Sequence, residues 1–223
     1  MKNEQLLRKR NMPIDFKKEY KDLYQPKTTP CIIDVPEMVF IAVDGKGDPN
    51  TSEEYKNALE LLYGLSYSIK MSKMSGMQPV GYFEYVVPPL EGFWWSEDGY
   101  FDGTIIIDKN KLCWTSMIRQ PDFVTAAVFE AAKTALAKKK PNLDTLKAQL
   151  IKITEGLCVQ AMHIGSYDDE PTTIAAMEQY AVAQKYAIDI NDDRRHHEIY
   201  FYDPRKVAPE KLKTVIRHPI KKR

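Results

Sequence analysis

The chain has 223 residues, of which 43% are hydrophobic and 28% are charged, a composition that suits a folded globular protein and excludes a disordered one. Its 32 Lys and Arg residues balance 31 Asp and Glu residues, so no overall field would attract nucleic acid or an anionic membrane. No apolar run approaches the roughly 20 residues that a membrane-spanning helix needs, and the N-terminus lacks a signal-peptide core, so we expect a cytoplasmic protein.

Residues 1–30 are predicted to form an N-terminal arm that lies against a domain spanning residues 31–220, because prolines interrupt any long regular element in the arm. The first strand of the domain is the β-branched, apolar run that begins near Met38 and includes residues 39–43. It ends in the turn Asp44-Gly45-Lys46-Gly47-Asp48-Pro49.

An amphipathic helix is predicted after this turn. Thr51 and Glu54 have the spacing of a capping box, and apolar residues then recur every three or four positions. The residues of this stripe are Tyr55, Ala58, Leu59, Leu62, Leu65 and Ile69. Strand-like segments follow at residues 80–87 and 112–119, with Pro88-Pro89-Leu90-Glu91-Gly92 and then Phe93-Trp94-Trp95 between them. The first half therefore reads β-α-β-β.

Residues 121–155 are predicted to form a helical linker of two helices. The first runs from Asp122 to about Lys139, and the second runs from Leu143 to about Thr154, with Asn142 as its cap. The core-facing residues expected in the first helix are Val124, Ala127, Val128, Ala131 and Leu136.

After the linker the opening pattern returns. Residues 157–164 read as a strand, residues 165–171 as a polar turn, and Thr172 as the start of a helix. The apolar stripe of this helix is Ile174, Met177, Ala181 and Ile188. A strand from His197 to Asp203 closes the unit.

This recurrence predicts an α+β fold built from two β-α-β-β repeats, approximately residues 37–120 and 156–205, related by a pseudo-twofold axis. The strands are expected to form one antiparallel sheet with the helices on one side. A ligand cleft is expected between the repeats, because the junction of two related halves is a common place for one.

The last predicted strand is the most informative segment for function. Glu198, Tyr200 and Tyr202 lie two residues apart, so a strand would direct all three to the same face, with Ile199 and Phe201 toward the other. A face with one carboxylate and two aromatic rings is suited to bind a small molecule where it is sheltered from water.

Three segments of the chain resemble the GyrI-like (gyrase-inhibitor-like) small-molecule-binding family. They are Asp44-Gly45-x-Gly47-Asp48-Pro49, Val87-Pro88-Pro89-Leu90-Glu91-Gly92-Phe93-Trp94-Trp95 and His197-Glu198-Ile199-Tyr200-Phe201-x-Asp203-Pro204-Arg205. The resemblance implies two repeats around a cleft lined by aromatic residues, with Glu198 at its floor. The Pro-Pro-Leu-Glu-Gly-x-Trp-Trp element is also similar to that of stand-alone members that hydrolyse cyclopropane-bearing, DNA-alkylating antibiotics.

Aromatic residues near these segments are candidate walls of the cleft, since ring faces attract flat or cationic ligands. The candidates are Tyr82, Tyr85, Trp94, Trp95, Trp114, Tyr167, Tyr200 and Tyr202. Strand parity allows only one of the adjacent Trp94 and Trp95 to face the cleft, and it leaves open which face of residues 82–85 does so. Tyr55, Tyr63 and Tyr67 on the first helix are expected to be core or rim residues.

Glu198 and Tyr200 are the candidate catalytic residues. Glu198 would position or deprotonate a water molecule, and the Tyr200 hydroxyl would donate to a developing oxyanion. We expect no metal and no cofactor: His196 and His197 should point to opposite faces of a strand, and the three cysteines, Cys31, Cys113 and Cys158, lie far apart in apolar surroundings. The acidic run Asp168-Asp169-Glu170 is expected to be exposed before a helix.

Three functions remain open from the sequence. The first is a monomer or homodimer that sequesters aromatic, hydrophobic or cationic xenobiotics. The second is a cofactor-free hydrolase that opens cyclopropane rings in the same cleft. The third, inhibition of a topoisomerase by protein contact, depends on the family name alone.

Overall fold

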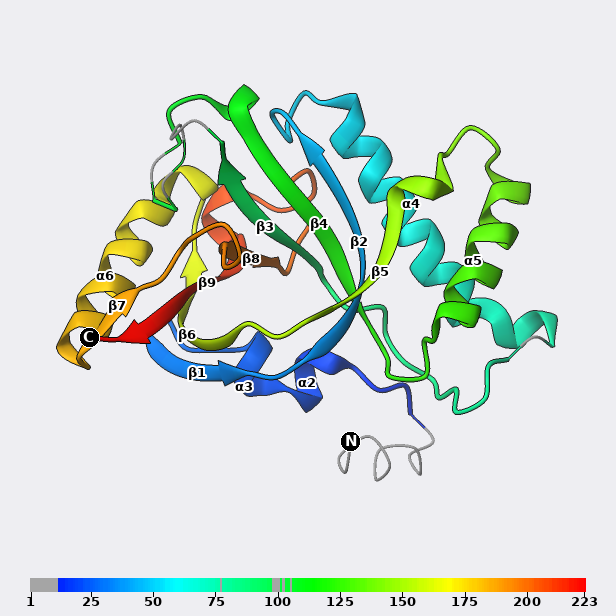
Figure 1. Cartoon of the computed structure of the whole chain (residues 1–223), viewed down its shortest axis with the longest axis horizontal. Coiled ribbons are helices and arrows are strands. Elements are labelled where there is room, and N and C mark those ends of the chain that lie inside the picture. The colour runs from blue at the N-terminus through cyan, green and yellow to red at the C-terminus, as the bar shows by residue number, and fades with distance from the viewer. Residues whose placement is uncertain (1–11, 77, 98–100, 102, 105) are drawn as a thin grey trace.

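The computed structural model describes residues 12–76, 78–97, 101, 103–104 and 106–223, and its centre is a nine-stranded sheet in which all pairings between strands are antiparallel (Figure 1). The strands are β1 (Cys31–Val35), β2 (Met38–Lys46), β3 (Leu90–Ser96), β4 (Leu112–Gln120), β5 (Ala148–Ile153), β6 (Gly156–Ile164), β7 (Tyr186–Ile188), β8 (His196–Tyr200) and β9 (Lys213–Lys222). The α-helices are α2 (Phe16–Glu19), α3 (Lys21–Tyr24), α4 (Glu53–Lys70), α5 (Ala126–Lys139) and α6 (Glu170–Ala183). The short 3-10 helices are η1 (Met71–Ser75), η2 (Lys109–Lys111), η3 (Thr145–Lys147), η4 (Tyr167–Asp169) and η5 (Pro209–Lys211).

The order of the strands reveals the symmetry of the fold. Along the sheet they run β1-β6-β9-β8-β3-β4-β2-β5, with β7 attached to β9. Exchanging β2 with β6, β3 with β8, β4 with β9 and β1 with β5 leaves this order unchanged, so a pseudo-twofold axis passes between β3 and β8. The predicted α+β fold with two β-α-β-β repeats is confirmed as β2-α4-β3-β4 and β6-α6-β8-β9.

The long helix of each repeat covers the same face of the sheet. Helix α4 packs on β2 and β4, and α6 packs on β6, so the two helices lie toward opposite ends of the sheet with the central strands between them (Figure 1). Helix α5 packs on the outside of α4. None of the helices in the described residues combines the length and the apolar character needed to cross a bilayer.

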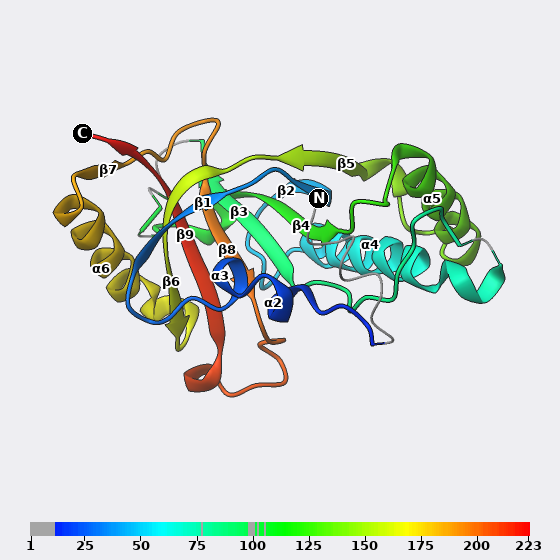
Figure 2. The same ribbon diagram turned by 90° about the horizontal axis from the view of Figure 1, so that it is seen from below.

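The other face of the central strands is covered by α2 and α3, which pass in front of those strands in Figure 2. The Tyr24 hydroxyl donates to Glu91 Oε1 at 3.1 Å, and Arg217 Nη2 donates to the Leu23 carbonyl at 2.9 Å. Glu91 pairs with Ile199 in the β3–β8 register, so it lies on the face opposite that of Glu198. The N-terminal helices are therefore joined to the sheet by buried polar contacts.

A buried network of charges lies beneath these helices. Arg217 Nη1 is 2.8 Å from Glu155 Oε1, and His197 Nδ1 is 3.0 Å from Glu155 Oε2. On its other side, His197 Nε2 is 3.1 Å from Glu91 Oε2. The neighbouring Arg and His hold the pKa of Glu155 down at about 2, even though burial by itself would raise it.

Two predicted elements are wrong. Residues 143–154 were expected to be helical, but they form η3 and strand β5, which pairs with the otherwise open edge of β2. The β-branched Ile151 and Ile153 suit a strand there. Residues 80–87 form no strand, and within them only Tyr85 makes a single bridge, to Ile14. The strand begins at Leu90 instead, immediately after two prolines that cannot donate to a ladder.

Other boundaries also differ from the prediction. Ser52, not Thr51, caps α4 by accepting from the Tyr55 amide at 3.3 Å. In α5 the buried residues are Phe129, Ala132 and Leu136, whereas Ala127 and Ala131 are exposed. Helix α6 begins at Glu170, Ile188 belongs to β7, and β8 ends at Tyr200. Strands β1 and β9 were missed, so the second repeat continues beyond residue 205.

Candidate functional site

A cavity of about 1050 Å³ lies on the face of the sheet that α4 and α6 cover, between α4 and the start of α6. Its floor is formed by β3 and β8, and the segment after β8 contributes to its wall. The aromatic residues that line it are Tyr55, Tyr63, Tyr67, Trp94, Phe101, Tyr167, Tyr200, Phe201 and Tyr202. The cavity is therefore a ring-lined site large enough for a drug-sized organic molecule.

Five of the predicted site residues lie in the lining of this cavity. They are Trp94, Tyr167, Glu198, Tyr200 and Tyr202. Phe201 was expected to point away, but it also lines the cavity, because the chain leaves the sheet after Tyr200 and strand alternation no longer applies.

The remaining predicted wall residues lie elsewhere. Tyr82 and Tyr85 pack around Phe123, with ring centroids 5.3 and 6.0 Å from it, and the Tyr82 hydroxyl donates to the Lys70 carbonyl. These two residues precede β3 and belong to the core beside the N-terminal segment. They are therefore removed from the candidate ligand set.

The two other tryptophans do not line the cavity either: Trp114 is a core residue, whereas Trp95 is only partly buried. Trp95 lies on the face of the sheet opposite Trp94, with the Arg195 guanidinium 4.7 Å from its ring. Trp114 shares the face of Trp94, but it is fully buried beneath the Tyr55 ring, 5.0 Å away. Its indole crosses Gly45, where a Cβ atom would lie only 2.2 Å from the ring. Trp114 thus supports Tyr55 and does not reach the cavity.

The sequence interpretation missed the contribution of α4. Tyr55, Tyr63 and Tyr67 line the cavity, as does Leu59. These four residues recur at intervals of four, which places them on one face of a helix. Tyr55 and Leu59 belong to the predicted apolar stripe, and the available signal was that Tyr63 and Tyr67 continue it at the same spacing.

The sequence also missed Glu170. It was expected to be exposed with Asp168 and Asp169, but it is only 6% exposed and lines the cavity. Docking of α6 on β6 brings its first residue over the floor strand β8, which no local pattern in residues 168–170 predicts.

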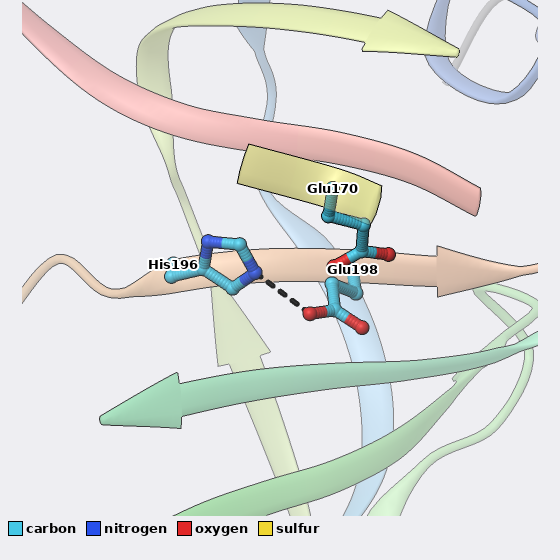
Figure 3. Close-up of side chains that lie close together, drawn as sticks. All are labelled: Glu170, His196 and Glu198. Carbon is cyan, nitrogen blue, oxygen red and sulfur yellow. Dashed lines mark hydrogen bonds and ion pairs between the residues drawn. The ribbon is translucent and has the colours of Figure 1, made fainter. Parts of the chain in front are cut away.

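Glu198 is the centre of a hydrogen-bonded cluster at the cavity floor (Figure 3). Its Oε1 lies 2.8 Å from His196 Nε2, a carboxyl oxygen of Glu170 lies within 4.8 Å of this pair, and Tyr200 is close enough to affect the charge of the carboxylate. The Tyr200 hydroxyl in turn accepts from Trp94 Nε1 at 2.7 Å.

The cross-strand partner of Glu198 is Gly92, whose lack of a side chain makes room for these contacts. A Cβ atom at position 92 would come within 2.9 Å of Trp94 Nε1 and 3.5 Å of the Tyr200 hydroxyl. Any larger residue would therefore press on the Trp94–Tyr200 hydrogen bond.

The two glutamates at the floor have opposite electrostatic environments. Burial and the adjacent Glu198 raise the pKa of Glu170 well above its ordinary value. Burial would also raise the pKa of Glu198, but hydrogen bonds from His196, Tyr200 and Glu170 hold it below its ordinary value. Glu170 therefore binds a proton more readily than Glu198 does, which suits Glu170 to act as an acid and Glu198 as an anion.

His196 extends the cluster away from the cavity. Its Nδ1 lies 2.7 Å from His218 Nε2, and both rings are buried. Burial and the neighbouring His196 hold the pKa of His218 well below its ordinary value, so His218 is neutral. As predicted, His197 points to the opposite face, where it contacts Glu155.

Glu170, His196 and Glu198 each offer one ligand atom, and these atoms lie within 4.8 Å of one another. Such a group is small enough to surround a metal ion. His196 Nε2 also lies at hydrogen-bonding distance from Glu198, so the same three side chains can serve as an acid–base group.

Comparison with known proteins also relates this chain to small-molecule-binding proteins. Residues 28–221 match the family model described as the GyrI-like small molecule binding domain. A crystal structure of a hydrolase from Listeria innocua has 48% sequence identity and a TM-score of 0.85, covering 93% of this chain and 100% of that chain. An uncharacterized conserved protein from the same organism has 51% identity and a TM-score of 0.88, with the same coverage. Among curated proteins, none matches this chain.

Proposed function

Because the chain belongs to the GyrI-like small-molecule-binding family, we propose that it binds planar, largely apolar small molecules in the ring-lined cavity and hydrolyses them with the carboxyl pair at its floor. The observation that carries this proposal is the proximity of Glu170 and Glu198, whose carboxyl oxygens lie within 4.8 Å of one another and whose pKa values are shifted in opposite directions. The similarity to the Listeria hydrolase over nearly the whole chain supports it.

Binding comes first. Flat aromatic ligands gain from stacking and edge contacts with rings, and the cavity offers such rings on several sides: Tyr55 and Tyr63 on α4, Trp94 on β3, and Tyr167 and Tyr200 near the floor. Entry of an apolar ligand displaces water from the cavity, which strengthens the electrostatic effect of the two carboxyl groups on the bound molecule.

The chemistry is addition of one water molecule. For the strained, carbonyl-conjugated cyclopropanes that the sequence resemblance implies, water attacks a ring carbon while a ring C–C bond breaks, and the released electron pair passes to the carbonyl oxygen. Glu198 accepts a proton from the attacking water, and Glu170 supplies a proton to the oxygen that gains charge. Transfer of the proton from Glu198 to Glu170, whose carboxyl oxygens lie within 4.8 Å of one another, then restores the pair.

Tyr200 has a different role from the one predicted. Its hydroxyl already contacts both Trp94 and Glu198, and burial beside the Glu198 charge raises its pKa well above the ordinary value. A weak acid committed to the floor carboxylate is a poor donor to substrate. Glu170 therefore replaces Tyr200 as the proton donor, and Tyr200 orients Glu198.

A second candidate function is sequestration without turnover, and the ionised state of Glu198 favours it. A negative charge at the bottom of a ring-lined cavity attracts planar cations, because the carboxylate and the ring faces act in the same direction. A binding protein for cationic xenobiotics would use the same residues.

One experiment separates the two functions. A cyclopropane-bearing alkylating agent is incubated with less than one equivalent of protein, and mass spectrometry follows the addition of one water. We expect many turnovers by the native protein and a loss of about 10²–10⁴-fold in rate for Glu198→Gln. The control is Glu210→Gln, which alters an exposed glutamate outside the cavity lining.

Normal turnover by the Glu198→Gln protein would refute the proposed chemistry. Tight binding of the agent with no turnover by the native protein would reject hydrolysis and select sequestration. In that case Glu198→Gln should weaken the binding of a planar cationic dye more than the binding of a neutral dye of the same shape.

A further inference from the structure

We propose that His196, held in place by His218, is a positioning residue that keeps Glu198 ionised and thereby confines the shared proton to Glu170. This inference rests on the proposed function, because it concerns how that carboxyl pair is prepared for catalysis. His196 itself does not line the cavity and does not touch a bound molecule.

The argument starts from an asymmetry between two like groups. Two buried carboxyl groups in contact share one proton, and each could carry it unless a neighbour distinguishes them. In the described residues His196 makes this distinction: its Nε2 is 2.8 Å from Glu198 Oε1, whereas the buried Glu170 Oε1 has no hydrogen-bond partner. A donor that reaches only one carboxyl favours the anion there.

The direction of the hydrogen bond is fixed by chemistry. A carboxylate only accepts, so His196 Nε2 must carry the proton that bonds to Glu198. On the opposite side of the ring, His196 Nδ1 meets His218 Nε2 at 2.7 Å. This second contact fixes the orientation of the imidazole, as a hydrogen bond to the other nitrogen commonly does for a functional histidine.

Within the described part of the chain, few titratable groups compete with this arrangement. Those that face His196 and its carboxylate there are His218 on β9, Glu170 on α6, and Tyr55, Tyr167 and Tyr200 around the cavity. The Phe101 ring, 5.2 Å from the imidazole, covers it from the side. Because His196 is only 1% exposed, water does not replace its hydrogen bond to Glu198.

The proposal is tested with two amide substitutions that differ in the position of their donor. The amide of His196→Gln reaches approximately the position of Nε2, so it retains a donor for Glu198. The amide of His196→Asn reaches only the position of Nδ1, so it retains the contact with His218 and loses the donor. The control is His163→Gln, which alters another buried histidine outside the cavity lining.

We expect His196→Asn to lower kcat by about 10–100-fold, with KM nearly unchanged, because the residue does not touch substrate. Loss of the donor destabilises the Glu198 anion, so the acid limb of the pH–rate profile should move to higher pH by about one unit or more. His196→Gln should keep the limb near its native position. A limb that stays in place in the Asn variant, or moves equally in both variants, would overturn the proposal.

A second measurement needs no turnover and no stable Asn variant. NMR of the native protein with ¹⁵N-labelled histidine and ¹³C-labelled glutamate should show His196 Nε2 protonated and Glu198 ionised while Glu170 retains its proton. An unprotonated Nε2, or a protonated Glu198 with an ionised Glu170, would contradict the inference. If the native protein only binds ligands, the proposed hydrolysis fails while this protonation pattern is still tested directly.

Discussion

Glu170 and Glu198 show how neighbours, and not residue type, decide what a side chain can do. Both are glutamates in the lining of the same cavity, but His196 donates to Glu198, and Glu170 faces the negative charge that results. The same pair of roles, one acid and one anion, appears wherever two carboxyl groups have unequal surroundings.

The pH dependence of turnover follows from the two shifts. A base works when it is ionised, so activity should fall as the pH drops through the lowered pKa of Glu198. An acid works when it is protonated, so activity should fall as the pH rises through the raised pKa of Glu170. Glu170→Gln should reduce kcat by about 10²–10⁴-fold and remove the alkaline limb, as measured by steady-state rates across the pH range. An alkaline limb that persists unchanged in this variant would show that another group is the acid.

Strand parity alone was enough to place Glu198 and Tyr200 on one face, and to separate His196 from His197 and Trp94 from Trp95. It was insufficient for Glu170, because the burial of a helix-start acid depends on where the helix docks. It was also insufficient for Trp114, which lies on the cavity face of the sheet but is covered by the Tyr55 ring.

At the level of elements, the start of α4 offers two adjacent residues, Thr51 and Ser52, that could each cap the helix. Thr51 and Glu54 have capping-box spacing, but Ser52 is the residue whose side chain accepts from the Tyr55 amide. The helix then begins one residue later than the box predicts. Since α4 carries Tyr55 and Tyr63, this cap also sets where the aromatic wall begins.

Adjacent substitutions test this cap. Ser52→Ala should lower the free energy of unfolding by about 1 kcal/mol, because an amide in the first turn loses its acceptor. Thr51→Ala, the matched control, should change it by less than about 0.5 kcal/mol. Urea denaturation followed by circular dichroism measures the free energy of unfolding of both variants. A larger decrease for Thr51→Ala than for Ser52→Ala would show that Thr51, and not Ser52, caps the helix.

Long elements were predictable from local pattern: α4 carries an apolar stripe, and β2, β4 and β6, which are buried on both faces over most of their length, are rich in apolar residues. Strand β5 was not predictable, because its residues fit a helical pattern as well as a strand. It forms a strand because the open edge of β2 is available to pair with it. Strand β9 pairs with both β6 and β8 and completes the second repeat, but a basic tail with an internal proline conceals it.

At the level of the whole molecule, the sheet separates two kinds of polar chemistry. One face carries the cavity, and the other carries Glu155, Arg217 and His197 beneath the N-terminal helices. A buried charge that loses its partner is costly, so this network ties the first residues of the domain to its central strands.

Glu155→Gln should therefore destabilise the protein by about 3–5 kcal/mol, because it leaves Arg217 and His197 without their shared carboxylate. The pKa of Glu155 is about 2, below its ordinary value of 4.5, so its contribution is present above pH 4.5 and is lost as the pH falls toward 2. Denaturation at several pH values should show that the free energy of unfolding decreases less between pH 4.5 and 2 in the variant than in the native protein.

The control for this prediction is Glu37→Gln. Glu37 pairs with Lys152 on the surface, where both side chains are more than half exposed, and such a pair is worth about 0–1 kcal/mol. Equal destabilisation by the two substitutions would contradict a structural role for the buried network.

Strand β8 belongs to both faces at once, with His196 and Glu198 serving the cavity and His197 and Ile199 serving the core. Adding or deleting one residue there would exchange the two sets and disrupt both the cavity floor and the core. Tyr63 and Tyr67 of α4 and the segment after β8 have no such double role, whereas Tyr55 also packs on Trp114. New ligand preferences can therefore evolve by single replacements along the outer walls, over a floor that the architecture itself holds constant.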